Sequence, residues 1–182
     1  LAADVVRQEL GDDPERIFRR WEPEPVAAAS VGQVHRAMLR DGRAVAVKVQ
    51  YPGVDTAILA DLDNAEVLYG LFSAFALKGL DVRALVDELR MRMGDELDYR
   101  MEADAQDGFA LAFAGDPEFA VPNLIEGAEH VLVSEWLEGY SLAKVISEGT
   151  PEERDHCGTP SLRFLMSGPT RAKMPLGNKC MQ

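Results

Sequence analysis

The chain has 182 residues, of which 47% are hydrophobic, and it carries 19 Lys and Arg against 31 Asp and Glu, a formal net charge of −12. This length and apolar share suit one ordinary globular domain. The acidic balance argues against non-specific binding to nucleic acid and against broad adhesion to anionic lipid, because both require clustered Lys and Arg.

Composition also limits cofactors and cellular setting. The two cysteines, Cys157 and Cys180, form no zinc motif and define no disulfide framework, so a reducing, cytoplasmic setting is expected. No signal peptide is visible at the start, and the longest apolar run, residues 67–77, is too short to cross a bilayer. The histidines have no partners at metal-ligand spacing and are interpreted as surface or packed residues: His35, His130 and His156.

The first 25 residues predict a helical lead-in. Residues 1–10 have the pattern of a helix that Gly11 ends. The pair Asp13-Pro14 is typical of a second helix start, with Pro at the first helical position, and this helix is expected to continue to Trp21. The prolines of residues 21–25 then require an extended chain.

A β-hairpin is the next predicted element. Two apolar-rich strands, residues 31–39 and 44–50, flank the turn signal Asp41-Gly42. Lys48 lies in the middle of the second strand and has two interpretations. It is either an edge-strand lysine whose stem covers apolar neighbours, or a cation held over a polyphosphate by a rigid strand and a partner carboxylate.

Helical spacing of apolar residues predicts two long helices, over residues 55–77 and from Val82 to about Phe113, the second with a possible kink at Gly94. The second helix carries an acidic cluster. Asp98 and Glu102 are four residues apart and share one face, whereas Glu96 faces elsewhere. Charge pattern alone favours a solvated acidic helix face over a partner for Lys48.

Two short strands are predicted at residues 119–126 and 130–137, followed by a helix over residues 142–146. The composition changes after Asp155. Residues 157–182 contain no acidic residue, both cysteines, three prolines and three glycines, and they are expected to form an atypical, disordered tail.

Three blocks of this sequence resemble the signature blocks of the UbiB/AarF atypical kinase-like family, the coenzyme-Q-linked kinases. They are VAAASVGQVHRA, VAVKVQYPGV and DELDYRMEA, and they occur in the family's order. The resemblance implies an α+β fold, a protein-kinase-like small lobe with a twisted antiparallel sheet and inserted helices. It divides the chain into the lead-in, a small lobe over residues 26–140, the start of a large lobe over residues 141–156, and the tail.

The resemblance also implies which residues form the site. In place of the glycine-rich loop of protein kinases, the family uses an alanine-rich loop over the nucleotide phosphates, matched here by Ala27, Ala28, Ala29 and Ser30. Lys48 matches the phosphate-binding lysine, and Glu102 matches the helix glutamate that pairs with it. Glu96 and Asp98 match a Glu-x-Asp element that bears on metal and on autoinhibition. Main-chain groups near Glu135 and Leu137 match the hinge that reads adenine.

The expected function is therefore binding of ATP or ADP with Mg²⁺, in a protein that the resemblance links to ubiquinone biosynthesis, to lipid or quinone-pathway partners and to membranes. The catalytic-loop and Asp-Phe-Gly motifs of the large lobe do not occur in the 182 residues. We therefore expect a lobe truncated before the catalytic part and without phosphotransfer activity. The alternative is a non-catalytic fragment that binds a protein partner through residues 67–77.

Overall fold

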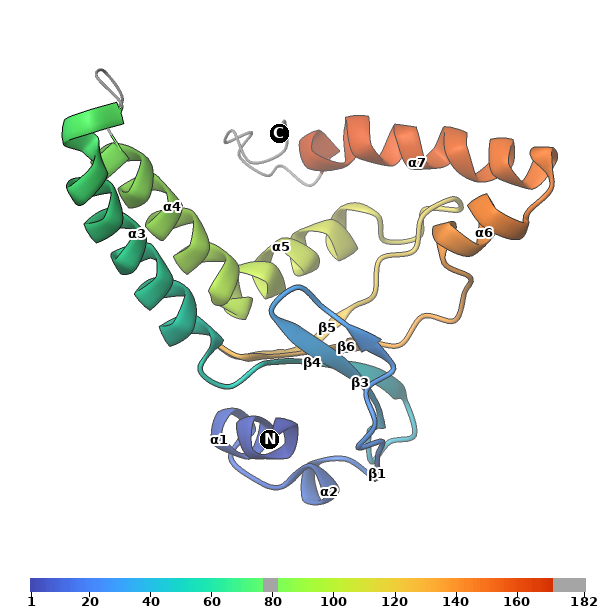
Figure 1. Ribbon diagram of the computed structural model, residues 1–182. Coiled ribbons are helices and arrows are strands. Elements are labelled where there is room, and N and C mark those ends of the chain that lie inside the picture. The colour runs from blue at the N-terminus through green and yellow to red at the C-terminus, as the bar shows by residue number, and fades with distance from the viewer. Residues whose placement is uncertain (77–81, 172–182) are drawn as a thin grey trace.

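The computed structural model describes residues 1–76 and 82–171 and shows a twisted antiparallel sheet with helices on both faces (Figure 1). The α+β class predicted from the sequence is confirmed. The strands are β1 Arg20–Trp21, β2 Ala27–Ala28, β3 Gly32–Met38, β4 Ala44–Gln50, β5 Leu124–Gly127 and β6 Val131–Glu135. The helices are α1 Ala2–Leu10, α2 Pro14–Ile17, α3 Val54–Ala76, α4 Val82–Leu97, α5 Tyr99–Ala112, α6 Leu142–Glu148 and α7 Pro151–Arg171.

The sheet is built around the predicted hairpin of β3 and β4. The strand order is β1-β3-β4-β6-β5, and β2 also pairs with β3. Gly42 adopts a φ of 95° in the connecting turn, a conformation that glycine allows without steric cost. Because β4 lies between β3 and β6, the interpretation of Lys48 as an edge-strand lysine is wrong.

Alternation along β4 separates the two faces of the sheet. Val45, Val47 and Val49 are fully buried in one core with Val6 of α1 and Phe18, on the side that α1 and α2 cover in Figure 1. The intervening residues, including Lys48, point to the opposite face, where α5 lies. The valines of β4 thus anchor the strand in the core on one face of the sheet, and Lys48 projects from the opposite face.

The second helix is shorter than predicted. α2 ends at Ile17, and residues 20–21 form β1, paired with the end of β3, instead of a helical turn. The reason is local packing: Trp21 stacks on the buried ring of His35 with centroids 4.6 Å apart. The His35 Nδ1–H donates to the Glu22 carbonyl at 2.9 Å, so His35 is a packed histidine, one of the two interpretations that the sequence indicated.

The predicted long helix over residues 82–113 is also wrong as one element. It breaks at Asp98 rather than kinking at Gly94, which lies inside α4. Asp98 is extended and caps α5, accepting a hydrogen bond from the Arg100 N–H. The buried Gln50 side chain donates to the Leu97 carbonyl at 2.8 Å, which ties the end of β4 to this break.

Helices α3 and α4 form an antiparallel hairpin that projects from the sheet (Figure 1). An ion pair between Asp63 and Arg90, 2.6 Å long, joins the two helices. The stretch predicted to bind a partner, residues 67–77, lies outside what the structure describes. Its side chains are not described, and neither is the backbone at Leu77. Across the described parts of the chain, we find no helix with both the length and the apolar character that a bilayer crossing needs.

The C-terminal part differs from the sequence expectation. Residues 119–123 are not in a strand, and β5 begins only at Leu124. Helix α7 continues through the segment expected to be a disordered tail as far as Arg171, and residues 172–182 lie outside the described residues. Phe164 of α7 packs against Phe109, Phe113 and Phe119, with ring centroids 5.2–5.7 Å apart, and this aromatic contact fixes α7 on α5.

Candidate functional site

Lys48 and Glu102 meet across the sheet–helix boundary. The Lys48 Nζ lies 2.6 Å from the Glu102 Oε2, although the two residues are 54 positions apart in the chain. β4 supplies the lysine from an inner strand, and α5 supplies the glutamate from its first turn. The inserted hairpin of α3 and α4 occupies the sequence between them. A connection of this length is compatible with the contact, because the entropic cost of closing a loop grows only slowly with its length.

This ion pair contributes little to stability by itself. The side chains of Lys48 and Glu102 are 24% and 46% exposed, and pairs this open to solvent typically contribute between 0 and about 1 kcal/mol. The strand and the helix terminus therefore bring together two charged groups whose contact adds little to the free energy of folding. Such an arrangement fixes the ammonium in space, where a phosphate oxygen could replace or join the carboxylate.

The ring of Tyr99 lies beneath the lysine. Tyr99 is the first residue of α5 and 1% exposed, and the Lys48 Nζ lies 4.4 Å from its ring centroid. Sequence reasoning missed this residue. The available signal was its position three residues before Glu102, which places both on one helix face.

The alanine-rich loop forms a small hairpin next to this pair. Ala27 and Ala28 pair with Val34 and Gln33 as β2, and the Ala29 N–H donates to the Gly32 carbonyl at 2.8 Å. The tip of the loop is therefore formed by residues 30–31, and the Ser30 hydroxyl is exposed there. The side chains of this hairpin before its tip are the methyl groups of Ala27, Ala28 and Ala29.

The predicted hinge follows β6. The Glu135 N–H donates to the Asn123 carbonyl, and the Glu135 carboxylate accepts from the Asn123 side chain at 2.7 Å. Among the residues that the structure describes, none hydrogen-bonds the main chain of Leu137, which is 49% exposed. The Glu135 N–H is thus engaged within the sheet, whereas both main-chain groups of Leu137 are available to a ligand.

Side chains near the hinge form a further contact that the sequence did not reveal. Arg36 of β3 lies over the Trp136 ring, 4.7 Å from its centroid, and pairs with Glu138 at 2.9 Å. The same strand face carries Val34, opposite Lys48, and Ala46, opposite Arg36. Small apolar side chains thus lie between the loop and the hinge, a surface suited to a flat ring.

Glu96 and Asp98 do not approach the lysine as directly as Glu102. Glu96 is exposed near the end of α4. Both oxygens of Asp98 are engaged by the Arg100 guanidinium at 2.8–3.1 Å. These hydrogen bonds lower the pKa of Asp98 and keep it ionised. No group of three or more His, Cys, Asp or Glu that could hold a metal ion occurs among residues 1–76 and 82–171.

Replacing Asp98 by Ala should lower the free energy of unfolding by about 1 kcal/mol near neutral pH, because α5 loses its N-cap. The pKa of Asp98 is depressed below its usual 3.8, so the stabilising carboxylate is fully present above that value and is lost as the pH falls through the folded-state pKa. The difference from the parent should therefore shrink in acid below pH 3.8. Urea denaturation at both pH values measures it, with Asp98→Asn as the control that retains a capping oxygen. A loss independent of pH would contradict this account.

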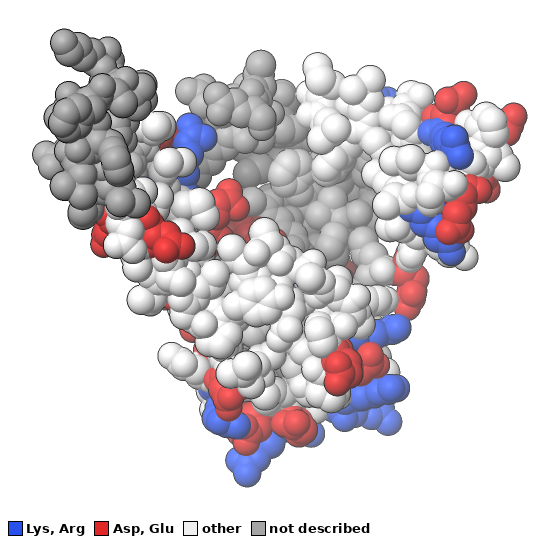
Figure 2. Space-filling view, viewed as in Figure 1, with Lys and Arg blue, Asp and Glu red and all other residues white. Residues whose placement is uncertain are grey.

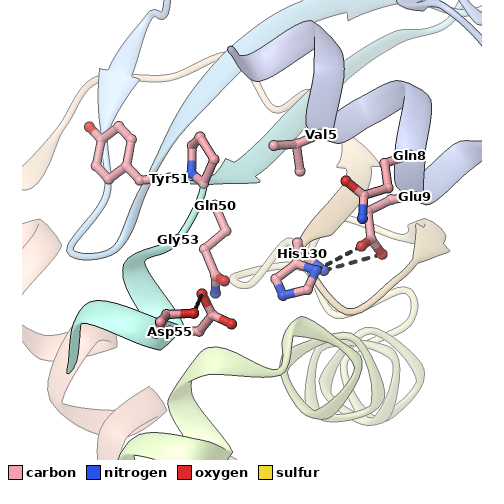
Figure 3. Close-up of a pocket in the computed structure, with 10 residues that line it drawn as sticks. Val5, Gln8, Glu9, Gln50, Tyr51, Gly53, Asp55 and His130 are labelled. Atoms are coloured by element: carbon pink, nitrogen blue, oxygen red, sulfur yellow. Dashed lines mark hydrogen bonds and ion pairs between the residues drawn. The ribbon is translucent and has the colours of Figure 1, made fainter. Parts of the chain in front are cut away.

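A separate pocket of about 290 Å³ opens where α1, the end of β4, the start of α3 and the β5–β6 turn meet (Figure 3). His130 projects into it, and its Nδ1 lies 2.7 Å from the Glu9 Oε1. This pair, which the sequence did not predict, joins α1 to the β5–β6 turn. Lys48 is not among the lining residues, so this pocket is distinct from the Lys48–Glu102 site.

The space-filling view shows where the face above the sheet is hollowed (Figure 2). Charged side chains gather at the end of the molecule below the sheet and on the arm formed by α6 and α7, whereas the centre of this face is largely uncharged. A recess lies below α7, at the position that α5 occupies in Figure 1.

Sequence comparisons found relatives of this chain. A family model described as the ABC1 atypical kinase-like domain matches residues 1–157. The mitochondrial atypical kinase coq-8 of Caenorhabditis elegans is 37% identical over 145 residues, which cover 79% of this chain and 19% of that protein. The chloroplast protein Activity of BC1 Complex Kinase 1 of Arabidopsis thaliana is 36% identical over 144 residues, 76% of this chain and 21% of that protein.

One solved structure is similar over nearly the whole chain. It is the complex of Rv3197 of Mycobacterium tuberculosis with erythromycin, with a TM-score of 0.83 and 42% sequence identity over 94% of this chain and 44% of that chain. The chain thus spans about a fifth of the length of the two curated relatives and less than half of the solved one.

Proposed function

The chain belongs to the ABC1 atypical kinase-like domain family, and from this premise we propose that residues 26–140 form a nucleotide-binding small lobe. In this proposal, Lys48 binds the phosphates of ATP or ADP, Glu102 positions Lys48, and the alanine-rich loop covers the phosphates. The family and the α+β fold are the premise, and nucleotide binding is the inference.

One observation carries the proposal: the 2.6 Å contact of Lys48 with Glu102 on an inner strand, next to the loop. An inner strand and a helix N-terminus are both rigid, and the contacts of the Lys48 ammonium with Glu102 and with the Tyr99 ring restrict its flexible side chain. The ion pair contributes too little to stability to account for this alignment. A phosphate ligand, which needs a fixed cation, accounts for it.

The remaining site residues receive narrower roles. Ala27, Ala28, Ala29 and Ser30 line the phosphates, the Ser30 hydroxyl and nearby N–H groups being the donors. Main-chain groups of Glu135 and Leu137 read the adenine edge, and the Glu135 side chain supports the hinge through Asn123. Glu96 and Asp98 act as regulatory residues near the nucleotide rather than as phosphate ligands.

The described residues do not themselves fit a magnesium site, because the carboxylates nearest Lys48 are engaged. Glu102 binds Lys48, and Arg100 occupies Asp98. In this proposal, Mg²⁺ enters only as the counterion of the nucleotide phosphates, and the function of the chain is binding rather than turnover. A role beside lipid or quinone-pathway proteins, including ubiquinone biosynthesis and a membrane-associated setting, extends the proposal through the family alone.

Titration of the full chain with Mg-ATP and Mg-ADP, followed by calorimetry, tests the proposal. We expect saturable binding at one site, and a rise in thermal stability with nucleotide concentration, because a ligand that binds only the folded state stabilises it by mass action. Inorganic triphosphate and adenosine, titrated separately, report whether the phosphates or the ring dominate. Absence of saturable binding by a folded chain would refute a nucleotide site.

A further inference from the structure

We propose that Tyr99 is a positioning residue of the nucleotide site: its ring holds the Lys48 ammonium against Glu102, and its hydroxyl fixes the base of the alanine-rich loop at Gly32. This inference rests on the proposed function and deepens it, since it names the side chain that couples the lysine, the loop and helix α5.

The ring contact has the geometry of a cation–π interaction. The Lys48 Nζ lies 4.4 Å from the ring centroid, inside the range of about 6 Å over which the quadrupole attracts a cation. Lys48 is thus bounded by the Tyr99 ring and by the Glu102 carboxylate, both from the first turn of α5. Two contacts in different directions define its position more closely than one.

The hydroxyl contact reaches the loop. Gly32 closes the loop by accepting from the Ala29 N–H, and it is buried. A Cβ placed on Gly32 would lie 2.8 Å from the Tyr99 hydroxyl, so the two residues are in direct contact. Tyr99 of α5 thus contacts both the base of the loop and the lysine.

Packing alone does not explain a tyrosine at this position. The Tyr99 hydroxyl is buried and has no hydrogen-bond partner among the described residues, a state that typically costs about 1–3 kcal/mol. Phenylalanine would fill the same apolar surroundings, Ala103, Leu132 and Val31, without that cost. Burial, with the nearby charge of Glu102, raises the pKa of Tyr99 to about 12, so the hydroxyl stays protonated and is a potential donor.

The first experiment tests the ring without any nucleotide. Lys48 is labelled with an amine-selective acylating reagent in the full chain, and the modified peptides are quantified by mass spectrometry. In Tyr99→Met, which removes the ring but retains an adaptable apolar side chain, labelling should accelerate about two- to fivefold, since one side of the amine loses its cover. In Tyr99→Phe the rate should equal that of the parent. Lys144, which lies 4.9 Å from the Tyr140 ring on a different element, should be unaffected in both variants.

The second experiment tests the hydroxyl. Tyr99→Phe should unfold at the same or a higher urea concentration than the parent, because a buried polar group without a partner is removed. It should nevertheless bind Mg-ADP about two- to fivefold more weakly, since the loop base loses its contact. If Tyr99 had only a structural role, Tyr99→Phe would not combine unchanged or higher stability with weaker binding of Mg-ADP.

The outcomes separate the two proposals. Unchanged Lys48 labelling in folded Tyr99→Met, or parental affinity in Tyr99→Phe, would overturn the positioning role of Tyr99 even if the parent binds nucleotide. A parent that binds no nucleotide refutes the nucleotide site itself, whatever the labelling shows. Should Tyr99→Met fail to fold, Tyr99→Phe decides alone through its affinity.

Discussion

Replacing Lys48 by Met should weaken binding of Mg-ATP and Mg-ADP by at least about tenfold while the chain stays folded. Hydrogen bonds to a charged group typically contribute about 1.5–3 kcal/mol, and about 1.4 kcal/mol corresponds to a factor of ten in affinity. Met fills the space of the lysine stem, so the packing of β4 between β3 and β6 is retained. Calorimetric titration measures the affinity, and circular dichroism with urea denaturation measures the fold.

The stability of Lys48→Met should change by no more than about 1 kcal/mol, because the Lys48–Glu102 pair is partly exposed. Lys144→Met is the matched control, since Lys144 also lies over a tyrosine ring but on α6, away from the site. It should bind nucleotide with parental affinity. Affinity within twofold of the parent in Lys48→Met would show that the lysine does not bind phosphates.

A double-mutant cycle separates the pairing of Lys48 and Glu102 from their action on a ligand. Glu102→Gln removes the charge that positions the lysine but leaves the lysine itself, so its effect on affinity should be smaller than that of Lys48→Met. If Glu102 acts only through Lys48, the double variant should bind as weakly as Lys48→Met, and the two effects should not add.

The sequence predicted the parts of this fold that local patterns encode. The Asp41-Gly42 turn between two apolar runs placed the β3–β4 hairpin within one residue at each end, because a two-residue period and a turn signal are short-range features. The family blocks placed Lys48 opposite Glu102 across 54 residues, which no periodicity could do. The role of that contact in nucleotide binding stays a prediction.

The features that the sequence did not predict depend on tertiary contacts. Apolar spacing continues through Asp98, so periodicity indicated one helix, whereas the structure ends α4 there and anchors its last carbonyl to Gln50. The partner of a buried side chain is likewise absent from any local pattern. Tyr99 has its significance from Lys48 and Gly32, which belong to strands far earlier in the chain.

Helix α7 is a second element that the local sequence pattern did not predict. Pro160 and the glycines of α7 argue locally against a helix, yet Phe164 joins three phenylalanines from α5 and the segment after it. Apolar contact with an existing surface can outweigh weak local propensity. The position of α7 beside α5 therefore follows from that aromatic contact and not from its own sequence pattern.

The second large effect is expected at Gly32, where Ala should destabilise the chain by about 3 kcal/mol and abolish nucleotide binding. A Cβ there would lie 2.4 Å from the Val49 carbonyl oxygen and 3.1 Å from the Gln50 Cα, both backbone atoms of β4. Backbone cannot rotate away as a side chain can, so the first pair of the β3–β4 ladder, Gly32 with Gln50, must separate. The same separation displaces the base of the alanine-rich loop from Lys48.

Gly94→Ala is the matched control for this prediction, because nothing lies within 4 Å of a Cβ at Gly94, in the last turn of α4. It should stabilise the chain by about 0.5–1 kcal/mol, since Ala is the better helix former. Urea denaturation of both variants gives the two free energies, and opposite signs are the expected result. A Gly32→Ala variant of parental stability would mean that β4 and the Tyr99 hydroxyl do not approach Gly32 as closely as the structure shows. The coupling of loop, lysine and helix would then lose its physical basis.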